Sequence, residues 1–455
     1  MSRTAFAWVV YSVFAVALLL LSCRKETIVV APPIINAPSE LSVVSISDTL
    51  VTLKWHDNSS DETGFVIEQS YDGVSYAVAR NVAPNETTAV VSLALDSTRS
   101  YFFRLRASGG QGGSGFSNRV RVYYEDALYA VGAFSTAGDV PVSNVARWDG
   151  VRWTAVGTGV NEGVGGIASY RNDLYIGGGF TAAGGSQARY VARFDGSNWV
   201  PVGSGTDQHI HTLAVYRDEL YIGGWFYHVG LISTIGIARW NGSTWSDVGG
   251  GLNDDVYSLY VHDSDLFVGG YFTQAGGIWA RYVARWDGSA WQALGGGMNG
   301  NVTCFAAYNG EIYAGGFFTY AGGPDRRYIA RWDGADWLPV GTGVSDWIFS
   351  MAVFNGDLYA AGGFSTAGGV NARNVARWSG TQWDSVGIGV DNRAYALAVY
   401  KNELYAAGSF GRAGGVEARH IARWNGSAWS GIGSGLDGAP WRLVPITRWV
   451  WESLP

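Results

Sequence analysis

Short stretches of alternating hydrophobic and polar residues fill the chain from about residue 127 onward, and the whole pattern recurs at a fixed interval. The hydrophobic pair Leu128 and Tyr129 returns 46 residues later as Leu174 and Tyr175. Five more copies continue the series with Leu220 and Tyr221, Leu266 and Phe267, Ile312 and Tyr313, Leu358 and Tyr359, and Leu404 and Tyr405. A fixed period of this length indicates that each copy is one supersecondary unit, which buries its apolar surface against its neighbours.

Within one copy, residues 303–342, the alternation predicts four short strands separated by turns. Asn309 followed by Gly310, and Asp333 followed by Gly334, are typical of tight hairpin turns, because glycine accepts the positive φ that such turns need. The strands are expected at residues 303–308, 311–318, 328–332 and 337–340. Seven such copies predict an all-β fold in which residues 127–446 form a closed seven-bladed β-propeller.

Closure of this ring depends on residues 441–446, which follow the seventh copy and align with residues 395–400, the first strand of that copy. The first copy enters at Ala127 with its second strand, so the C-terminal strand can complete it. A closed ring also removes exposed strand edges, which otherwise template aggregation. Pro445 weighs against this pairing because proline lacks a backbone donor. Residues 447–455 leave the repeat pattern and are predicted to form an irregular tail.

The order of elements in each copy resembles a kelch repeat. The marks are a glycine doublet at the end of the second strand, as in Gly315 and Gly316, and spaced aromatic residues in the third and fourth strands. The galactose oxidase propeller belongs to the same broad group. The resemblance covers residues 127–446 and implies seven blades, with the C-terminal strand completing the first one.

Three residue types recur at one slot in every copy, and each has a structural explanation. A glycine is expected where a side chain would contact the neighbouring blade or where the strand needs a bulge. The glycines are Gly132, Gly178, Gly224, Gly270, Gly316, Gly362 and Gly408. A tryptophan is expected to fill the gap between blades, with an aromatic cage for a ligand as the alternative. The tryptophans are Trp153, Trp199, Trp245, Trp291, Trp337, Trp383 and Trp429.

The third repeated type is arginine, which lies near the same end of each blade as an acidic residue. The arginines are Arg147, Arg193, Arg239, Arg285, Arg331, Arg377 and Arg423, and the acidic residues are Asp173, Glu219, Asp265, Glu311, Asp357 and Glu403. We expect cross-strand ion pairs within each blade.

Residues 37–124 resemble a fibronectin type III domain, which implies a β-sandwich. Trp55 matches the core aromatic residue, Leu95 and Tyr101 have the spacing of a tyrosine corner, and residues 116–118 lead into the last strand. No Arg-Gly-Asp tripeptide occurs, so a rigid spacer is a better interpretation than a cell-adhesion module.

The N-terminus has the features of an export signal. Residues 1–22 combine Arg3 with an uncharged apolar stretch, and a single membrane-anchor helix is the alternative interpretation. Residues 20–23, Leu-Leu-Ser-Cys, resemble a bacterial lipobox, which implies cleavage before Cys23 and lipidation of its thiol. Residues 23–36 then form the lipidated cysteine and a tether. Arg24 is not the aspartate that resembles an inner-membrane retention signal, so we expect an outer-membrane or cell-surface lipoprotein of a Gram-negative bacterium.

Composition narrows the function further. Hydrophobic residues make up 47% of the chain and charged residues 15%, which excludes a disordered chain. The net charge is −7 without a long basic run, so we expect no nucleic-acid partner. The 65 glycines and the 14% aromatic content suit short strands joined by tight turns.

A ring of polar residues opens the loops between copies. Its members are Asn161, Asp207, Asn253, Asn299, Ser345, Asp391 and Asp437. Such side chains favour local turns, so loop capping is the default interpretation. The alternative is a ring of oxygens that binds sugar hydroxyls or a cation, for which Ca²⁺ would be the candidate. Asp207, Asn253 and Asp391 of this ring are candidate ligand-binding residues. The spacing of a calcium-binding loop is absent.

A few residues break the repeat on the same face and are the other candidate ligand-binding residues. The third copy has Tyr227 and His228 where other copies have Ala-Gly-Gly, and His209 and His211 precede it. Trp279 and Trp347 lie in other loops of this face. Exposed aromatic residues beside carboxylates suit sugar rings and protein partners equally well. Two histidines without a third ligand give a weak metal signal, so no metal site is assigned.

Enzyme chemistry has little support. Cys304 lies on an expected innermost strand and is interpreted as a small buried residue rather than half of an oxidase Cys-Tyr crosslink. No Gly-x-Ser-x-Gly motif occurs. The sequence favours a non-enzymatic, monomeric, cofactor-free lipoprotein whose loop face binds a glycan or a protein at the cell envelope. A secreted carbohydrate-active or oxidative enzyme and a purely structural envelope component are the alternatives.

Overall fold

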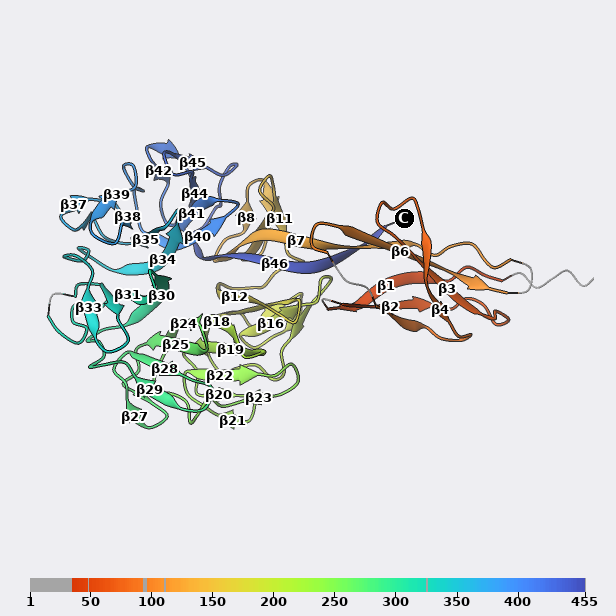
Figure 1. Cartoon of the computed structure of the whole chain (residues 1–455), viewed down its shortest axis with the longest axis horizontal. Coiled ribbons are helices and arrows are strands. Elements are labelled where there is room, and N and C mark those ends of the chain that lie inside the picture. The colour runs from red at the N-terminus through yellow and green to blue at the C-terminus, as the bar shows by residue number, and fades with distance from the viewer. Residues whose placement is uncertain (1–34, 48, 93–95, 110–111, 325, 455) are drawn as a thin grey trace, which may run out of the picture.

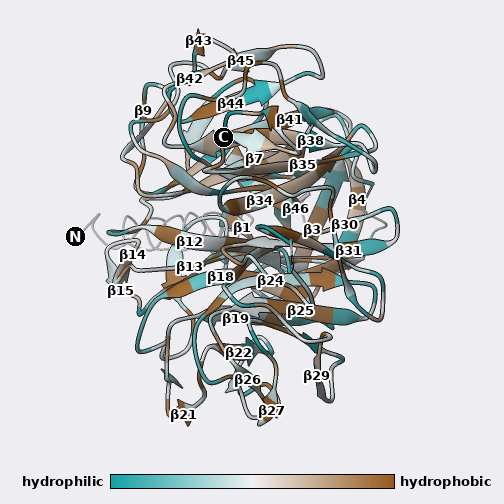
Figure 2. Cartoon of the chain, turned by 90° about the vertical axis from the view of Figure 1, so that its left-hand side faces the viewer, coloured by the Kyte–Doolittle hydropathy of each residue, from teal (hydrophilic) through white to brown (hydrophobic). Residues whose placement is uncertain are grey.

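The computed structural model describes residues 35–454 except 48, 93–95, 110–111 and 325. The predicted signal peptide, Cys23 and most of the tether lie outside the described residues. Every regular element in the described part is a β-strand, which confirms the all-β prediction. No helix in that part is long and apolar enough to cross a membrane. Hydrophobic residues are concentrated on strands such as β24 and β25 (Figure 2).

The N-terminal part is a sandwich of two sheets. One sheet contains β1 (Ser39–Ile46), β2 (Leu50–His56) and β5 (Thr88–Ser92), and the other contains β3 (Gly64–Ser70), β4 (Ala77–Val82), β6 (Ser100–Ser108) and part of β7 (Arg119–Gly132). Trp55 packs edge-on against Phe65 in the core, with ring centroids 5.4 Å apart. The Tyr101 hydroxyl accepts a hydrogen bond from the backbone N–H of Asp96, as in a tyrosine corner. Leu95 lies outside the described residues.

The rest of the described chain forms repeated four-stranded antiparallel sheets, one for each 46-residue copy. In the first copy β46 (Pro440–Leu454), β7, β10 (Val145–Trp148) and β11 (Trp153–Ala155) lie side by side. The next three sheets are β12 (Val164–Tyr170), β13 (Asp173–Gly178), β16 (Val191–Phe194) and β17 (Trp199–Pro201); β18 (Ile210–Tyr216), β19 (Glu219–Gly224), β22 (Ile237–Trp240) and β23 (Trp245–Ser246); and β24 (Val256–His262), β25 (Asp265–Gly270), β28 (Val283–Trp286) and β29 (Trp291–Ala293). The last three are β30 (Val302–Tyr308), β31 (Glu311–Gly316), β32 (Ile329–Trp332) and β33 (Trp337–Pro339); β34 (Ile348–Phe354), β35 (Asp357–Gly362), β38 (Val375–Trp378) and β39 (Trp383–Ser385); and β40 (Ala394–Tyr400), β41 (Glu403–Gly408), β44 (Ile421–Trp424) and β45 (Trp429–Gly431).

Six copies carry a small hairpin between their second and third strands. The hairpins are β8 (Thr136–Ala137) with β9 (Val140–Pro141), β14 (Ala182–Ala183) with β15 (Ser186–Gln187), β20 (His228–Val229) with β21 (Ile232–Ser233), β26 (Gln274–Ala275) with β27 (Ile278–Trp279), β36 (Thr366–Ala367) with β37 (Val370–Asn371), and β42 (Arg412–Ala413) with β43 (Val416–Glu417). Figure 1 shows β21, β27, β37 and β42 on the outside of the assembly, away from the first strands.

The first strands of the copies lie at the centre and contact one another in chain order, from β12 through β18, β24, β30 and β34 to β40 (Figure 1). β46 contacts both β40 and β12, so the circuit of contacts returns to its start. Each described sheet is nevertheless open, because no sheet in that part of the chain is hydrogen-bonded into a closed barrel.

β46 pairs with β7 along its whole length, and this differs from the irregular tail predicted for residues 447–455. The register runs from Pro440 opposite Gly132 to Leu454 opposite Arg119. Residues beyond 446 leave the repeat pattern because they pack against the sandwich instead of a neighbouring copy. Trp449, for example, lies in the sandwich core, 6.0 Å from the Tyr101 ring. Pro445 is tolerated because β46 pairs only with β7 and is therefore an edge strand.

The repeated glycine slot is explained by a β-bulge. In every copy the register between the first and second strands shifts by one residue near this glycine. A Cβ on Gly362, for example, would lie 1.9 Å from the carbonyl oxygen of Trp347 in the same sheet. The preceding position faces the next copy, since a Cβ on Gly315 would lie 2.7 Å from the Ile348 side chain. The bulge therefore explains the glycine that recurs in every copy. The contact with the next sheet, which was the other expected reason, instead concerns the residue directly before that glycine.

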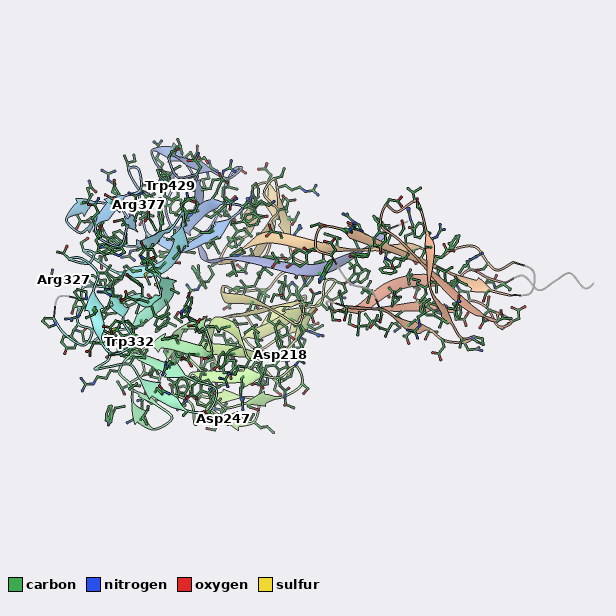
Figure 3. All side chains as sticks on the ribbon, viewed as in Figure 1. Asp218, Asp247, Arg327, Trp332, Arg377 and Trp429 are labelled. Atoms are coloured by element: carbon green, nitrogen blue, oxygen red, sulfur yellow. The ribbon has the colours of Figure 1, made fainter. Side chains whose placement is uncertain are left out.

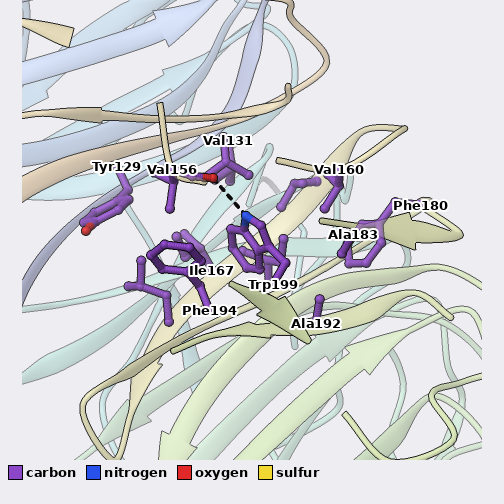
Figure 4. Packing of buried hydrophobic residues seen from close by; sticks show 14 of the residues in the cluster. Tyr129, Val131, Val156, Val160, Ile167, Phe180, Ala183, Ala192, Phe194 and Trp199 are labelled. Atoms are coloured by element: carbon purple, nitrogen blue, oxygen red, sulfur yellow. Dashed lines mark hydrogen bonds between the residues drawn. The ribbon is translucent and has the colours of Figure 1, made fainter. Parts of the chain in front are cut away.

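The repeated tryptophans fill the space between sheets, as predicted. Trp199 is buried among residues of its own copy and the preceding one, and its Nε1 donates a hydrogen bond to the Val156 carbonyl at 2.8 Å (Figure 4). The same bond recurs from Trp245 to Val202, Trp291 to Val248, Trp337 to Leu294, Trp383 to Val340 and Trp429 to Val386. Trp153 packs between the last and first copies, and its Nε1 has no partner among the described residues. The aromatic-cage alternative is therefore wrong, since these rings are buried.

The expected cross-strand ion pairs are present. The pairs are Arg193 with Asp173, Arg239 with Glu219, Arg285 with Asp265, Arg331 with Glu311, Arg377 with Asp357, and Arg423 with Glu403. In the first copy Arg147 contacts the buried Glu125 at 2.9 Å instead. Figure 3 marks Arg377 and Trp429 in two successive sheets. Half-exposed pairs of this kind contribute roughly 0–1 kcal/mol each, so the sheets depend mainly on apolar packing.

The tryptophan hydrogen bond can be isolated by a matched pair of substitutions. Trp383→Phe should lower the free energy of unfolding by about 1 kcal/mol more than Trp153→Phe. Both changes remove the same volume, but only the first removes a hydrogen bond, because Trp383 Nε1 donates to the Val340 carbonyl, which then keeps only the Gly343 N–H, whereas Trp153 Nε1 has no partner among the described residues. Chemical unfolding of the two variants measures the difference. Equal losses would show that the bond contributes nothing beyond packing.

Candidate functional site

The polar ring that opens the loops caps those loops. In every copy the side-chain oxygen accepts hydrogen bonds from two successive backbone N–H groups, so loop capping is confirmed. The pairs are Asn161 with residues 181 and 182, Asp207 with 227 and 228, Asn253 with 273 and 274, Asn299 with 319 and 320, Ser345 with 365 and 366, Asp391 with 411 and 412, and Asp437 with 135 and 136. One side-chain oxygen of each of Asp207, Asn253 and Asp391 is therefore engaged by the backbone.

Tyr227 and His228 belong to the small hairpin of the third copy. The Nδ1 atom of His228 lies 3.0 Å from a carboxylate oxygen of Asp207. Burial opposes ionisation of Asp207, but hydrogen bonds from the His228 side chain and from backbone N–H groups lower its pKa below the ordinary value. The Tyr227 hydroxyl accepts a hydrogen bond from Nε1 of Trp225. This group therefore stabilises a loop.

Trp279 is not brought together with the other candidates. It lies on β27, an outer hairpin in Figure 1, and its side chain is 68% exposed. No aromatic ring of the described residues stacks on it. Trp347, in contrast, lies in an aromatic group near the centre of the circuit of first strands.

The bulge in each first strand positions a variable side chain there. A bulge leaves one extra residue out of the ladder and re-aims its side chain. We call these extra positions the bulge residues: Gly165, His211, Tyr257, Thr303, Phe349, Tyr395 and Trp441. The glycine opposite each bulge is constant, whereas the bulge residue differs between most copies. The bulges thus have the same backbone conformation in every copy but carry different side chains.

Five of the bulge residues line one cavity of about 310 Å³, which we call the mouth. The residues that line the mouth are Tyr257, Thr303, Phe317, Phe349, Tyr395, Trp441 and Arg442. Phe317 packs against Trp347 at 4.7 Å and against Phe349 at 5.8 Å between ring centroids. Phe349 in turn meets Tyr395 edge-on at 5.4 Å. Aromatic rings from three copies therefore form one continuous wall.

A second cavity of about 400 Å³ continues inward between the first strands and shares Thr303, Phe349 and Arg442 with the mouth. Its lining is mostly small or apolar, including Ile167, Leu213 and Cys304. Burial raises the pKa of the Cys304 thiol to about 12, so the thiol stays protonated at neutral pH. The interpretation of Cys304 as a small buried residue is confirmed.

His211 lies beside the mouth and stacks on Tyr257, with ring centroids 5.0 Å apart and planes at 10°. Burial, followed by the positive charge of Arg442, lowers the pKa of His211 to about 4, so its imidazole is neutral at pH 7. His209 stacks on Tyr190 instead, at 5.5 Å. The two histidines thus contact different rings, and no group of three or more metal-ligating side chains occurs in the described part of the chain.

Acidic groups lie on one side of the mouth. A carboxylate oxygen of Asp255 accepts a hydrogen bond from the Tyr257 hydroxyl at 3.3 Å, and its other oxygen is buried without a partner among the described residues. Burial and the neighbouring Asp254 raise the pKa of Asp255. The same burial, with Asp255, raises the pKa of Tyr257 to about 12. The mouth therefore has the Tyr257 hydroxyl beside its aromatic wall, whereas the free oxygen of Asp255 is buried and Asp255 does not line the cavity.

Inspection of the sequence singled out Trp347 and His211 near this site but missed Tyr257, Phe317, Phe349, Tyr395, Trp441 and Arg442. All of these except Phe317 lie on strands, whereas the residues predicted from the sequence were expected in loops. A comparison of the seven copies slot by slot could have found them, because the bulge slot varies where its neighbours do not.

Comparisons with known proteins add little. No family model matches the chain, and no curated protein sequence matches it. Similar solved structures include the twitchin kinase region from C. elegans, at 24% identity over 19% of this chain and 16% of that chain, with a TM-score of 0.17. A two-domain fibronectin type III segment from chicken tenascin shares 10% identity over 56% of this chain and 96% of that one, with a TM-score of 0.16. The FN1–FN3 domains of chicken CNTN1 share 10% identity over 91% of this chain and 99% of theirs, with a TM-score of 0.18.

These comparisons correct the expected family. The resemblance to kelch and galactose-oxidase repeats is wrong as a family assignment, because no family model matches the chain and no sheet in its described part is closed. The glycines and tryptophans that suggested it are required by the bulges and by packing between sheets. At these TM-scores the similar structures carry no argument about fold or function.

The lowered pKa of His211 predicts how acid affects stability. The unfolded chain takes up a proton near pH 6.5, whereas the folded chain takes it up only near pH 4. Stability should therefore fall as the pH drops from about 6.5 to about 4 and should level off below that. His211→Phe keeps a stacking ring but cannot titrate, so its Tm should fall less between pH 7 and pH 4.5 than that of the native protein. Identical falls in Tm would contradict this assignment.

Proposed function

We propose that residues 127–446, closed by β46, form a seven-bladed β-propeller that binds a glycan at the mouth without catalysing a reaction. The observation that carries the proposal is the convergence of the bulge residues, which break the repeat, on one aromatic-lined cavity. The circuit of contacts between first strands supports the propeller, because β46 lies between β40 and β12. Residues 37–124 act in this proposal as a fibronectin-like spacer.

A glycan suits this cavity better than a protein surface does. The mouth holds about 310 Å³, a volume that suits a small-molecule or sugar site, whereas a stable protein interface buries about 800 Å² on each partner. Sugar rings stack their C–H faces on aromatic side chains, and Phe349, Tyr395 and Trp441 offer such faces. Tyr257 lines the mouth, and its hydroxyl oxygen can accept a hydrogen bond from a sugar hydroxyl.

Substitution of a mouth tryptophan tests this function against a matched control. Trp441→Ala should weaken binding of an oligosaccharide selected on a glycan array by about fivefold, because one stacking contact contributes on the order of 1 kcal/mol. Trp279→Ala removes a tryptophan from the outer hairpin β27, which is 68% exposed against 39% for Trp441, and should leave the affinity unchanged. Isothermal titration calorimetry measures both. Loss of binding in the control alone, or an array with no bound saccharide, would refute glycan binding at the mouth.

We also propose that the chain is exported and anchored by lipid on Cys23, at the outer membrane or surface of a Gram-negative bacterium. The support is the Leu-Leu-Ser-Cys sequence at residues 20–23. In a bacterial expression host, Cys23→Ala should abolish incorporation of radiolabelled palmitate and release the protein from the membrane fraction. Cys304→Ala, which alters the buried cysteine, should leave labelling intact. Labelling that persists in Cys23→Ala would exclude this anchor.

A further inference from the structure

Arg442 occupies a slot that holds a small residue in every other copy. The position lies directly after the bulge residue, and the other six residues at this slot are Gly166, Thr212, Ser258, Cys304, Ser350 and Ala396. Five of these six line the inner cavity together with Arg442. The small residues leave the space into which the arginine side chain extends, and Arg442 is the only charged residue among those that line either cavity.

The guanidinium of Arg442 has no carboxylate partner. Its Nη1 donates to the Trp441 carbonyl at 3.1 Å and its Nη2 lies 3.4 Å from the Tyr257 carbonyl. No ion pair of Arg442 occurs among the described residues, whereas the seven scaffold arginines each have a carboxylate within 4 Å. A guanidinium carries five N–H donors and stays protonated in proteins, so donors and a full charge remain available at the mouth. Burial of an uncompensated cation is costly, which favours an anion that binds there.

A second cation lies at the edge of the same aromatic wall. The Arg393 guanidinium carbon is 5.5 Å from the Trp347 ring centroid, and no ion pair of Arg393 is present in the described part of the chain. Asp255 also lies beside the mouth, but its carboxylate is engaged by the Tyr257 hydroxyl. Arg442 and Arg393 therefore give the mouth a positive side that the protein does not neutralise.

We propose that the mouth selects an acidic sugar unit, with the carboxylate or sulfate group of the sugar paired with Arg442 and its ring lying against the aromatic wall. This inference rests on the proposed glycan-binding function and specifies the ligand class. A carboxylate or a sulfate presents two oxygens at the spacing of the guanidinium fork, so either group can accept two parallel hydrogen bonds. Arg393 stands at the rim, where it attracts the anion before Arg442 binds it.

The test compares charged and uncharged forms of one ligand on the native protein. Trigalacturonate, its full methyl ester, and a sulfated galactose trisaccharide are titrated by calorimetry at 50 mM and 300 mM NaCl. At least one acidic trisaccharide should bind tenfold or more tightly than the methyl ester, and its affinity should fall at the higher salt concentration. The tighter of the two acidic ligands identifies the anion. Because this comparison needs no substitution, a variant that fails to fold cannot obscure the result.

Two variants assign the effect to Arg442. Arg442→Gln removes the positive charge and the guanidinium fork but keeps a shorter hydrogen-bonding side chain, and should reduce the acidic ligand's affinity to that of the methyl ester. Arg412→Gln, which changes an exposed arginine on the outer hairpin β42, should have no effect. Equal affinities for the acidic ligands and the ester in the native protein would overturn the acidic-sugar inference and leave glycan binding standing. Absence of binding by every saccharide would refute the proposed function itself.

Discussion

The pairing of β46 with β7 is the constraint on which the rest of the structure depends. β7 runs from the sandwich into the first repeated sheet, and β46 follows it over the same distance in the opposite direction. One antiparallel ribbon therefore completes the first copy, places a strand between β40 and β12, and supplies Trp449 to the sandwich core. Where the two parts join, the ribbon holds a buried charged group, in which Glu125 contacts Arg147 and Arg448 and accepts a hydrogen bond from Tyr129. The sandwich and the repeated sheets are thus two parts of one packed body.

The sequence was sufficient to predict the structural features that recur in every copy of the repeat. The period predicted the strands, the tryptophans between sheets, the ion pairs and the loop caps. Each of these contacts is made in most copies, so the residues that make it recur at the same position of the repeat. The tail was the exception in the scaffold. Residues 447–454 pack against the sandwich, so Trp449 is buried in a core that the 46-residue repeat does not predict. The family assignment was wrong because the glycine pairs and buried tryptophans are needed for sheet packing. Such residues recur wherever sheets pack in this way, so they do not identify a family.

The site was harder to predict because it depends on residues that do not recur. Trp347 and His211 were predicted from the sequence, and so was Trp279. The sequence shows that all three break the repeat, but only the structure shows that Trp279 lies apart from the other two. Arg442 was overlooked although its slot holds small residues in six copies. Its importance comes from the absence of a carboxylate partner, which only the folded arrangement reveals. The periodic scaffold sets the backbone of the bulges, and the single deviations from the period supply the chemistry.

The long reach of β46 also determines the order in which the molecule can be assembled. Asn118 donates a hydrogen bond to Ser453, 335 residues further along the chain, so the sandwich gains its last core residues only after all repeated sheets have been synthesised. Contacts over such a separation carry a large loop-closure cost and slow the final step of folding. During synthesis the edge of β7 remains without its partner while the other sheets form one after another. We therefore expect the pairing of β46 with β7, at the junction of the sandwich and the repeated sheets, to be the last step of folding.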